Sequence, residues 1–98
     1  MGIRSLRPGQ VNVYVEGVVV SKGEVRVVNT RRGPTRLCTA RLRGDDGGEV
    51  NLNLWGKQID EVEVGDRVRI ENGYVTTWRR QLFLNSGRRG RLVVLGRD

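Results

Sequence analysis

The chain has 98 residues, of which 18 are Lys or Arg, 11 are Asp or Glu and none is His, giving a net charge of +7 at pH 7. With one Cys and no His, we exclude His/Cys zinc sites, His-assisted nucleophilic catalysis and an internal disulfide. No apolar run reaches the length of a membrane-spanning helix, and we expect no signal peptide. These features predict a non-enzymatic, cytoplasmic protein made of one domain, residues 1–98, with no cofactor and no metal.

The charge is unevenly distributed along the chain. Residues 1–44 carry nine basic and two acidic side chains, residues 45–75 three basic and eight acidic, and residues 76–98 six basic and one acidic. The net charges of these segments are therefore +7, −5 and +5. This pattern predicts a basic face built from both ends of the chain, which is typical of proteins that bind a phosphate backbone. A solvated Arg-rich surface without a partner is the alternative.

The first strand is predicted from the alternation of Val with other residues from Val11 to Glu16, with all three valines facing the core. We extend this strand to Val28, with a bend or bulge at residues 21–23. Residues 29–35 combine Arg, Gly and Pro, which predicts a basic loop.

Two further strands are predicted over residues 37–43 and 49–55, joined by a tight hairpin at residues 44–48 that contains three glycines. This hairpin accounts for Asp45, Asp46 and Glu49 better than a divalent metal site does. The residues predicted to face the core are Cys38, Ala40 and Leu42 in the first of these strands and Val50, Leu52 and Leu54 in the second.

The next elements are a short helix over residues 57–62, ended by a Gly-Asp turn, and a long strand over residues 67–78. In this strand Val68 and Ile70 share the parity of Tyr74 and Trp78, although the aromatic pair need not belong to the core. Either Asn72-Gly73 is a hairpin turn, or it is a bulge that switches faces; the nearby turn signal at residues 79–80 favours the bulge.

The last predicted strands cover residues 81–85, with Leu82 and Leu84 inward and Phe83 outward, and residues 92–95, after a basic loop. Three strands, a short helix and two strands followed by a tail predict an all-β protein. We identify this order with the five-stranded Greek-key OB-fold barrel, which has a short helix between strands 3 and 4. An SH3-like barrel is the main rival, but it usually lacks a helix at that point.

Four aromatic side chains fall at outward positions of these strands: Trp55, Tyr74, Trp78 and Phe83. Exposing several large rings lowers solubility unless a ligand covers them, and bases of single-stranded nucleic acid stack on such rings. Packing at the rim of the core is the alternative for each ring taken alone. The residues predicted to contact the nucleic-acid backbone or base edges are Arg31, Arg32, Arg36, Arg41, Asn51, Asn53, Lys57, Arg79, Arg80 and Arg88.

The chain resembles the crenarchaeal single-stranded DNA-binding proteins and their relatives in the sensor-of-ssDNA complex and in replication protein A. The most specific matching motifs are Leu54-Trp55-Gly56-Lys57 and Ile70-Glu71-Asn72; others are Leu6 to Gly9, Val50 to Asn53 and Gln81 to Gly87. The resemblance implies an OB-fold that binds single strands with little sequence preference. It also implies stacking of bases on Trp55, Tyr74 and Trp78, and an aliphatic contact from Val28; Phe83 has no fixed aromatic counterpart.

We therefore expect a protein that binds and protects single-stranded DNA in replication and repair, acts as a monomer or weak oligomer in association with the nucleoid, and has no membrane partner. Members of this family often recruit proteins through a long C-terminal tail, and the sequence up to Asp98 contains none. Either the sequence is a shortened form, or we expect no recruitment of replication and repair proteins through such a tail. The alternatives are binding of single-stranded RNA in translation, and docking of a partner protein on the aromatic face.

Overall fold

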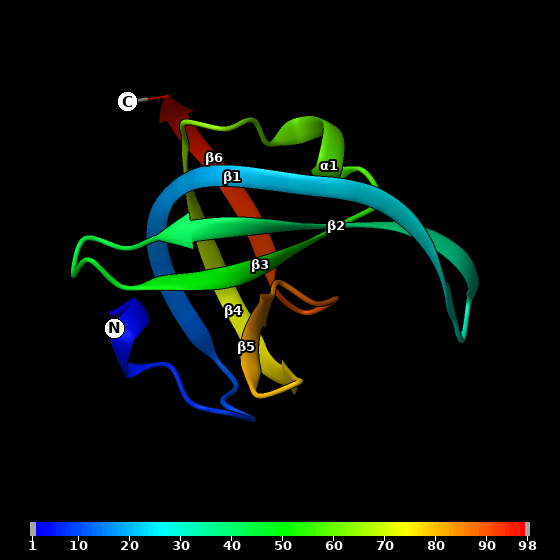
Figure 1. Cartoon of the computed structure of the whole chain (residues 1–98), viewed down its shortest axis with the longest axis horizontal. Helices are drawn as coiled ribbons and strands as arrows, with labels where there is room; N and C mark the ends of the chain where they lie inside the picture. The colour runs from blue at the N-terminus through cyan, green and yellow to red at the C-terminus, as the bar shows by residue number, and fades with distance from the viewer. Residues whose placement is uncertain (1, 98) are drawn as a thin grey trace.

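The computed structural model describes residues 2–97. Its main element is a β-sheet that closes into a barrel (Figure 1). Its order is β1-β2-β3-β5-β4, and β4 also pairs with β1; the β3–β5 pairing is parallel and the others are antiparallel. This is the predicted five-stranded OB-fold barrel, with helix α1 between β3 and β4. A further strand, β6, pairs with the first half of β4. The elements are a 3-10 turn Ile3–Ser5, β1 Val13–Thr30, β2 Gly33–Arg43, β3 Glu49–Trp55, α1 Gln58–Glu61, β4 Asp66–Trp78, β5 Gln81–Asn85 and β6 Arg91–Arg97.

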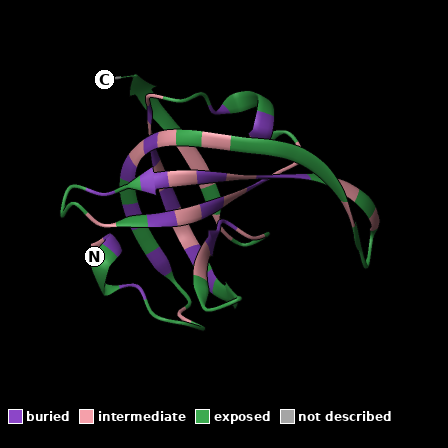
Figure 2. Cartoon of the chain, in the orientation of Figure 1, coloured by how far each residue is buried: buried purple, intermediate pink, exposed green. Residues whose placement is uncertain are grey.

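The core lies inside the barrel and is built mainly from inward-facing residues of β1 to β5, as the alternation of buried and exposed segments in Figure 2 shows. The predicted core positions of β2 and β3 are all buried, and Leu42, Leu52 and Leu54 are completely so. The prediction that Val11 faces the core is wrong, because its side chain is 62% exposed. Asn12 adopts a left-handed conformation with φ 55°, so the regular alternation begins only at Val13.

The bulge predicted in β4 is confirmed. Val13 lies opposite Gly73 and Val15 lies opposite Ile70, so β4 carries one more residue than β1 over this stretch, and Asn72 has φ 52°. Before the bulge the even-numbered Ile70 is buried, and after it the odd-numbered Val75 is buried. The extra residue therefore turns the side chain of Tyr74 from the core face to the outer face.

The predicted loop at residues 29–35 is wrong, because these residues continue a two-stranded ribbon that we call the arm (residues 25–35). Pairing of β1 with β2 runs to Thr30 opposite Gly33, and Arg31-Arg32 forms a two-residue turn. The Thr30 hydroxyl donates to the Gly33 carbonyl at 2.8 Å and accepts from the Arg32 amide at 3.2 Å. Since Val25 and Val27 are exposed, backbone pairing rather than burial stabilises the arm, which extends beyond the barrel (Figure 1).

Helix α1 closes one end of the barrel through Ile59, which is buried in the core. Lys22 of β1 donates from Nζ to the carbonyls of Ile59 and Val62, both at 2.8 Å, and so satisfies two carbonyls at the end of the helix. Within residues 2–97, no helix is long and apolar enough to cross a membrane.

We expect Gly90→Ala to destabilise the fold. A Cβ at residue 90 would collide with the carbonyl oxygens of Ser86, Glu71 and Asn72, which are backbone atoms that cannot move aside easily. Such overpacking costs about 1–3 kcal/mol, which urea unfolding would detect as a lower midpoint. Arg88→Ala, an exposed change in the same loop, is the control and should change the free energy of unfolding by less than about 0.5 kcal/mol.

Candidate nucleic-acid interface

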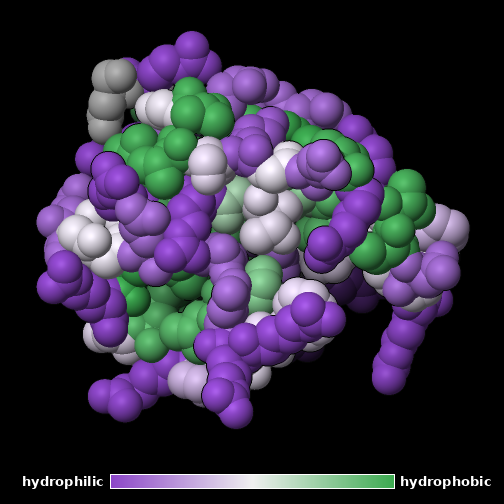
Figure 3. All heavy atoms as spheres, viewed as in Figure 1, coloured by the Kyte–Doolittle hydropathy of each residue, from purple (hydrophilic) through white to green (hydrophobic). Residues whose placement is uncertain are grey.

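A cleft of about 1180 Å³ lies between the end of the arm and the loop that joins β5 to β6. In Figure 3 the polar end of the arm stands away from the body of the protein and leaves a hollow beside it. Trp55, from the end of β3, and Tyr74, just after the β4 bulge, contribute the aromatic surface of the cleft. The residues that line the cleft are Val11, Asn12, Thr30 to Thr35, Trp55, Gln58, Asn72 to Tyr74, and Ser86 to Arg89.

Trp55 is half-buried and is held by two hydrogen bonds. Its backbone amide donates to Oε1 of Gln58 at 3.0 Å, and its indole Nε1 donates to Oδ1 of Asn85 at 3.1 Å. The ring is therefore anchored at its polar edge while part of its surface lines the cleft.

Tyr74 is 37% exposed, and the β5–β6 loop packs against its ring. Gly87 has φ 68°, and a Cβ at this position would come within 2.7 Å of Cε1 of Tyr74. Asn72, in the bulge, donates from Nδ2 to the carbonyl of Arg89 at 3.2 Å. The bulge therefore both turns Tyr74 outward and holds the loop beside it.

Basic side chains reach the cleft from both ends of the sequence. Arg31 and Arg32 lie at the turn of the arm, and Arg88 and Arg89 lie in the β5–β6 loop; all four are exposed. The fold thus brings two basic segments that are far apart in the sequence to opposite sides of one cleft.

Trp78 and Phe83 form a second aromatic cluster at the β4–β5 hairpin, outside the cleft. Their ring centroids are 6.4 Å apart in an edge-on arrangement, and Trp78 is 60% exposed. The guanidinium carbon of Arg79 lies 4.5 Å from the centroid of the Trp78 ring, a cation–π contact. Arg79 and Arg80 form the two-residue turn, with φ values of 51° and 66°, and both are exposed.

Asn51 and Asn53 lie on the outer face of β3, between the two aromatic clusters in sheet register. Asn51 donates from Nδ2 to Oε1 of Gln81 at 3.0 Å and accepts from Arg41 at 2.9 Å. Asn53 accepts from the Thr39 hydroxyl at 2.8 Å and donates to Asn85 at 3.0 Å. A hydrogen-bonded polar surface therefore crosses β2, β3 and β5.

Two of the predicted arginines carry carboxylate partners. Arg36 pairs with Asp60 at 3.0 Å, and this hydrogen bond raises the pKa of the guanidinium and lowers the pKa of the carboxyl. Arg41 pairs with Glu49 at 3.2 Å, and hydrogen bonds from Arg43 and then Arg41 lower the pKa of Glu49.

Two further predicted contact residues, Lys57 and Val28, and the hairpin carboxylate of Asp46 are placed as follows. Lys57 is exposed at the start of α1, and Val28 is half-buried in the arm; neither lines the cleft. Asp46, in the β2–β3 hairpin, accepts from the amides of Arg4 and Gly48, both at 2.9 Å, and these bonds lower its pKa. Its carboxylate therefore has a structural role in the hairpin.

Sequence reasoning did not single out Gln58, Asn85 and Ser86, which support the cleft. The amide Nε2 of Gln58 donates to the Ser86 hydroxyl at 2.7 Å, while Asn85 bonds the indole of Trp55. Asn85 could have been noticed, because it shares the outward parity of Phe83 on β5. Its burial, at 2% exposure, depends on β3 and could not be read from β5 alone.

Comparison with known proteins supports this fold, although no family model matches the chain. The chain is 31% identical over 96 residues to the single-stranded DNA binding protein Ssb of Saccharolobus solfataricus; the match covers 98% of this chain and 64% of that protein.

Solved structures of OB-fold domains match closely in shape but at low identity. The OB domain of a Thermoplasma acidophilum protein has a TM-score of 0.81 at 20% identity, covering 98% of this chain and 86% of that one. The second OB-fold domain of replication protein A from Methanococcus maripaludis has a TM-score of 0.75 at 22% identity, covering 98% and 94%. DNA binding domain A of the Saccharomyces cerevisiae protein has a TM-score of 0.72 at 17% identity, covering 100% and 95%. The chain therefore has the OB-fold and is similar, along nearly its whole length, to an archaeal single-stranded DNA-binding protein.

Proposed function

We propose that this protein binds single-stranded DNA with little sequence preference and catalyses no reaction. Bases stack on Trp55 and Tyr74 in the cleft, while Arg31, Arg32 and Arg88 neutralise phosphates around it. Every base has a flat face that can stack on an aromatic ring, so this mode of binding tolerates all sequences.

The observation that carries the proposal is the cleft itself, which combines two aromatic rings with arginines from two distant segments. Rings without basic residues would suit an apolar ligand, and basic residues without rings would suit duplex DNA as well as single strands. The similarity to a relative named for single-stranded DNA binding supports the same partner.

We further propose that the strand continues from the cleft across the outer face of β3 and β5 to Trp78 and Phe83. Asn51 and Asn53 lie along this path and can offer hydrogen bonds to base edges or sugars. The nucleic-acid backbone is contacted at the sides of this path by Arg36, Arg41, Lys57, Arg79 and Arg80. Val28 of the arm lies under a base.

In the cell, we propose that the protein coats and protects single strands exposed during replication and repair. It acts at the nucleoid, in the cytoplasm, as a monomer or weak oligomer.

A fluorescence titration tests the proposal, because Trp55 and Trp78 both lie on the proposed path. Oligo-dT should quench the Trp emission, and a duplex of equal length should do so only at much higher concentration. Oligo-dU and oligo-rU differ at the 2′ position of the sugar, so their comparison separates DNA from RNA binding. Unchanged emission at saturating oligo-dT would contradict the proposed path, and clear preference for oligo-rU would favour RNA.

A further inference from the structure

Asn85 and Ser86 are neighbouring polar residues that are buried beside the cleft. Among the polar and charged residues in the described part of the chain, only Asp66, Asn85 and Ser86 are buried. Burying an amide or a hydroxyl is unfavourable unless it is hydrogen-bonded, so such residues are retained where their bonds serve a purpose. Asn85 has outward parity on β5 and is not part of the barrel core.

All four hydrogen-bonding positions of the Asn85 amide are used. Oδ1 accepts from Nε1 of Trp55 at 3.1 Å and from Nδ2 of Asn53 at 3.0 Å. Nδ2 donates to the Thr76 hydroxyl and to the Phe83 carbonyl, both at 3.2 Å. A side-chain amide has no further capacity, and a reversed amide would point its own N–H groups at two donors. The orientation of Oδ1 toward the Trp55 indole is therefore fixed from three strands.

Ser86 acts on the same residue through Gln58. The Gln58 side chain donates to the Ser86 hydroxyl at 2.7 Å, and its Oε1 accepts from the backbone amide of Trp55 at 3.0 Å. Asn85 thus holds the ring of Trp55, and Ser86 holds its backbone. Asn85 ends β5 and Ser86 begins the loop that carries Arg88 and Arg89, so the position of Trp55 is linked to that of the basic loop.

We propose that Asn85 is a positioning residue, which holds the Trp55 indole in its stacking orientation before nucleic acid arrives. This inference rests on the proposed function for its effect on binding, but the fixed ring is a property of the free protein. Without Asn85 the ring would have to be ordered on binding, and immobilising one side chain costs about two- to tenfold in affinity.

The first test uses the free protein. Hydrogen exchange with solvent at the two indole N–H groups, measured by NMR, should be slow for Trp55 and fast for the exposed Trp78 in the unchanged protein. Asn85→Ala in a Trp78→Phe background should speed exchange at Trp55. Equally fast exchange at both indoles of the unchanged protein would overturn the proposal, and this comparison needs no variant to fold.

The second test is a double-mutant cycle between Asn85→Ala and Trp55→Ala, read as affinity for oligo-dT. If Asn85 acts through Trp55, Asn85→Ala should weaken binding about two- to tenfold in the unchanged protein and have no effect once Trp55 is alanine. An equal loss in both backgrounds, or no loss in either, would overturn the role.

Val75→Ala is the matched control for lost stability. Val75 is buried on β4, opposite Leu84 of β5, and makes no contact that the proposal uses. This variant should unfold at lower urea concentration but keep its affinity for oligo-dT within about twofold, because its cavity leaves the bonds of Asn85 intact. Should the unchanged protein fail to bind oligo-dT, the proposed function would fall, while indole exchange would still decide whether Asn85 fixes the ring.

Discussion

Replacing Trp55 and Tyr74 together with alanine should weaken binding of oligo-dT by at least about thirtyfold. Each stacked base is worth roughly 1–3 kcal/mol, so two platforms contribute roughly 2–6 kcal/mol. Trp55 is only half-buried and Tyr74 is at the rim, so their removal should leave the barrel folded. Affinity is measured by fluorescence anisotropy of a labelled oligonucleotide, because the change removes one of the two tryptophans.

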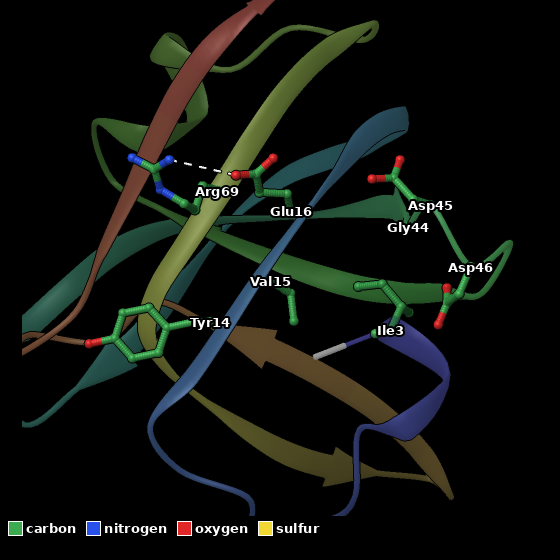
Figure 4. A pocket seen from close by; sticks show the side chains of 9 residues that line it. Ile3, Tyr14, Val15, Glu16, Gly44, Asp45, Asp46 and Arg69 are labelled. Carbon is green, nitrogen blue, oxygen red and sulfur yellow. Dashed lines mark ion pairs between the residues drawn. The ribbon is translucent and has the colours of Figure 1, made fainter.

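Tyr14→Ala provides the matched control for this prediction. Tyr14 is 56% exposed and borders a different hollow, which Figure 4 shows with Glu16, Asp45 and Arg69 around it. Among the described residues that line this hollow, none lines the cleft, and three carboxylates outnumber one arginine, which disfavours a phosphate chain. Tyr14→Ala should bind oligo-dT as the unchanged protein does. If Tyr14→Ala weakened binding as strongly as the cleft variant does, the loss could not be assigned to stacking of bases on Trp55 and Tyr74.

Removing the charge at the turn of the arm should lower the salt dependence of binding. For single strands, log K falls by about 0.7 per neutralised phosphate for each tenfold rise in salt. Arg31→Gln with Arg32→Gln should therefore reduce the slope by about 1.4 if each arginine neutralises one phosphate. If the two affinities converge near 1 M salt, the variant should bind about 25-fold more weakly at a tenth of that concentration.

Arg43→Gln is the control, since it removes one positive charge at a place outside the cleft. Arg43 lies at the end of β2, where it bonds Glu49 at 2.8 Å, and it does not line the cleft. Its slope should match that of the unchanged protein. Equal slopes for the arm variant and the unchanged protein would rule out phosphate neutralisation by the arm, whatever their affinities.

The parts of the fold that sequence reasoning predicted well are those in which one strand carries its own signal. In β3, Val50, Leu52 and Leu54 alternate with polar residues, and the bounds agree with the structure. The β4 bulge was predictable because two parities conflicted on either side of an Asn-Gly pair.

The features that were missed depend on contacts between distant residues. The arm has no buried face of its own, and its pairing of β1 with β2 could not be read from exposed Val25 and Val27. The bond from Trp55 to Asn85 spans 30 residues. Likewise, the ion pairs of Arg36 with Asp60 and of Arg41 with Glu49 form between distant residues. The residue type alone therefore did not distinguish these two arginines from Arg31 and Arg32.

The single extra residue at Asn72 sets the phase of everything that follows it in β4. Because side chains in a strand alternate with a period of two, a β4 of the same length that ran through Asn72 without the bulge would direct Tyr74 and Trp78 into the barrel and Val75 out of it. The barrel interior would then have to hold two additional aromatic rings, and the outer face of β4 would carry none. Tyr74 and Trp78, which are half of the aromatic surface proposed to meet nucleic acid, therefore face outward because the bulge leaves one residue out of the alternation.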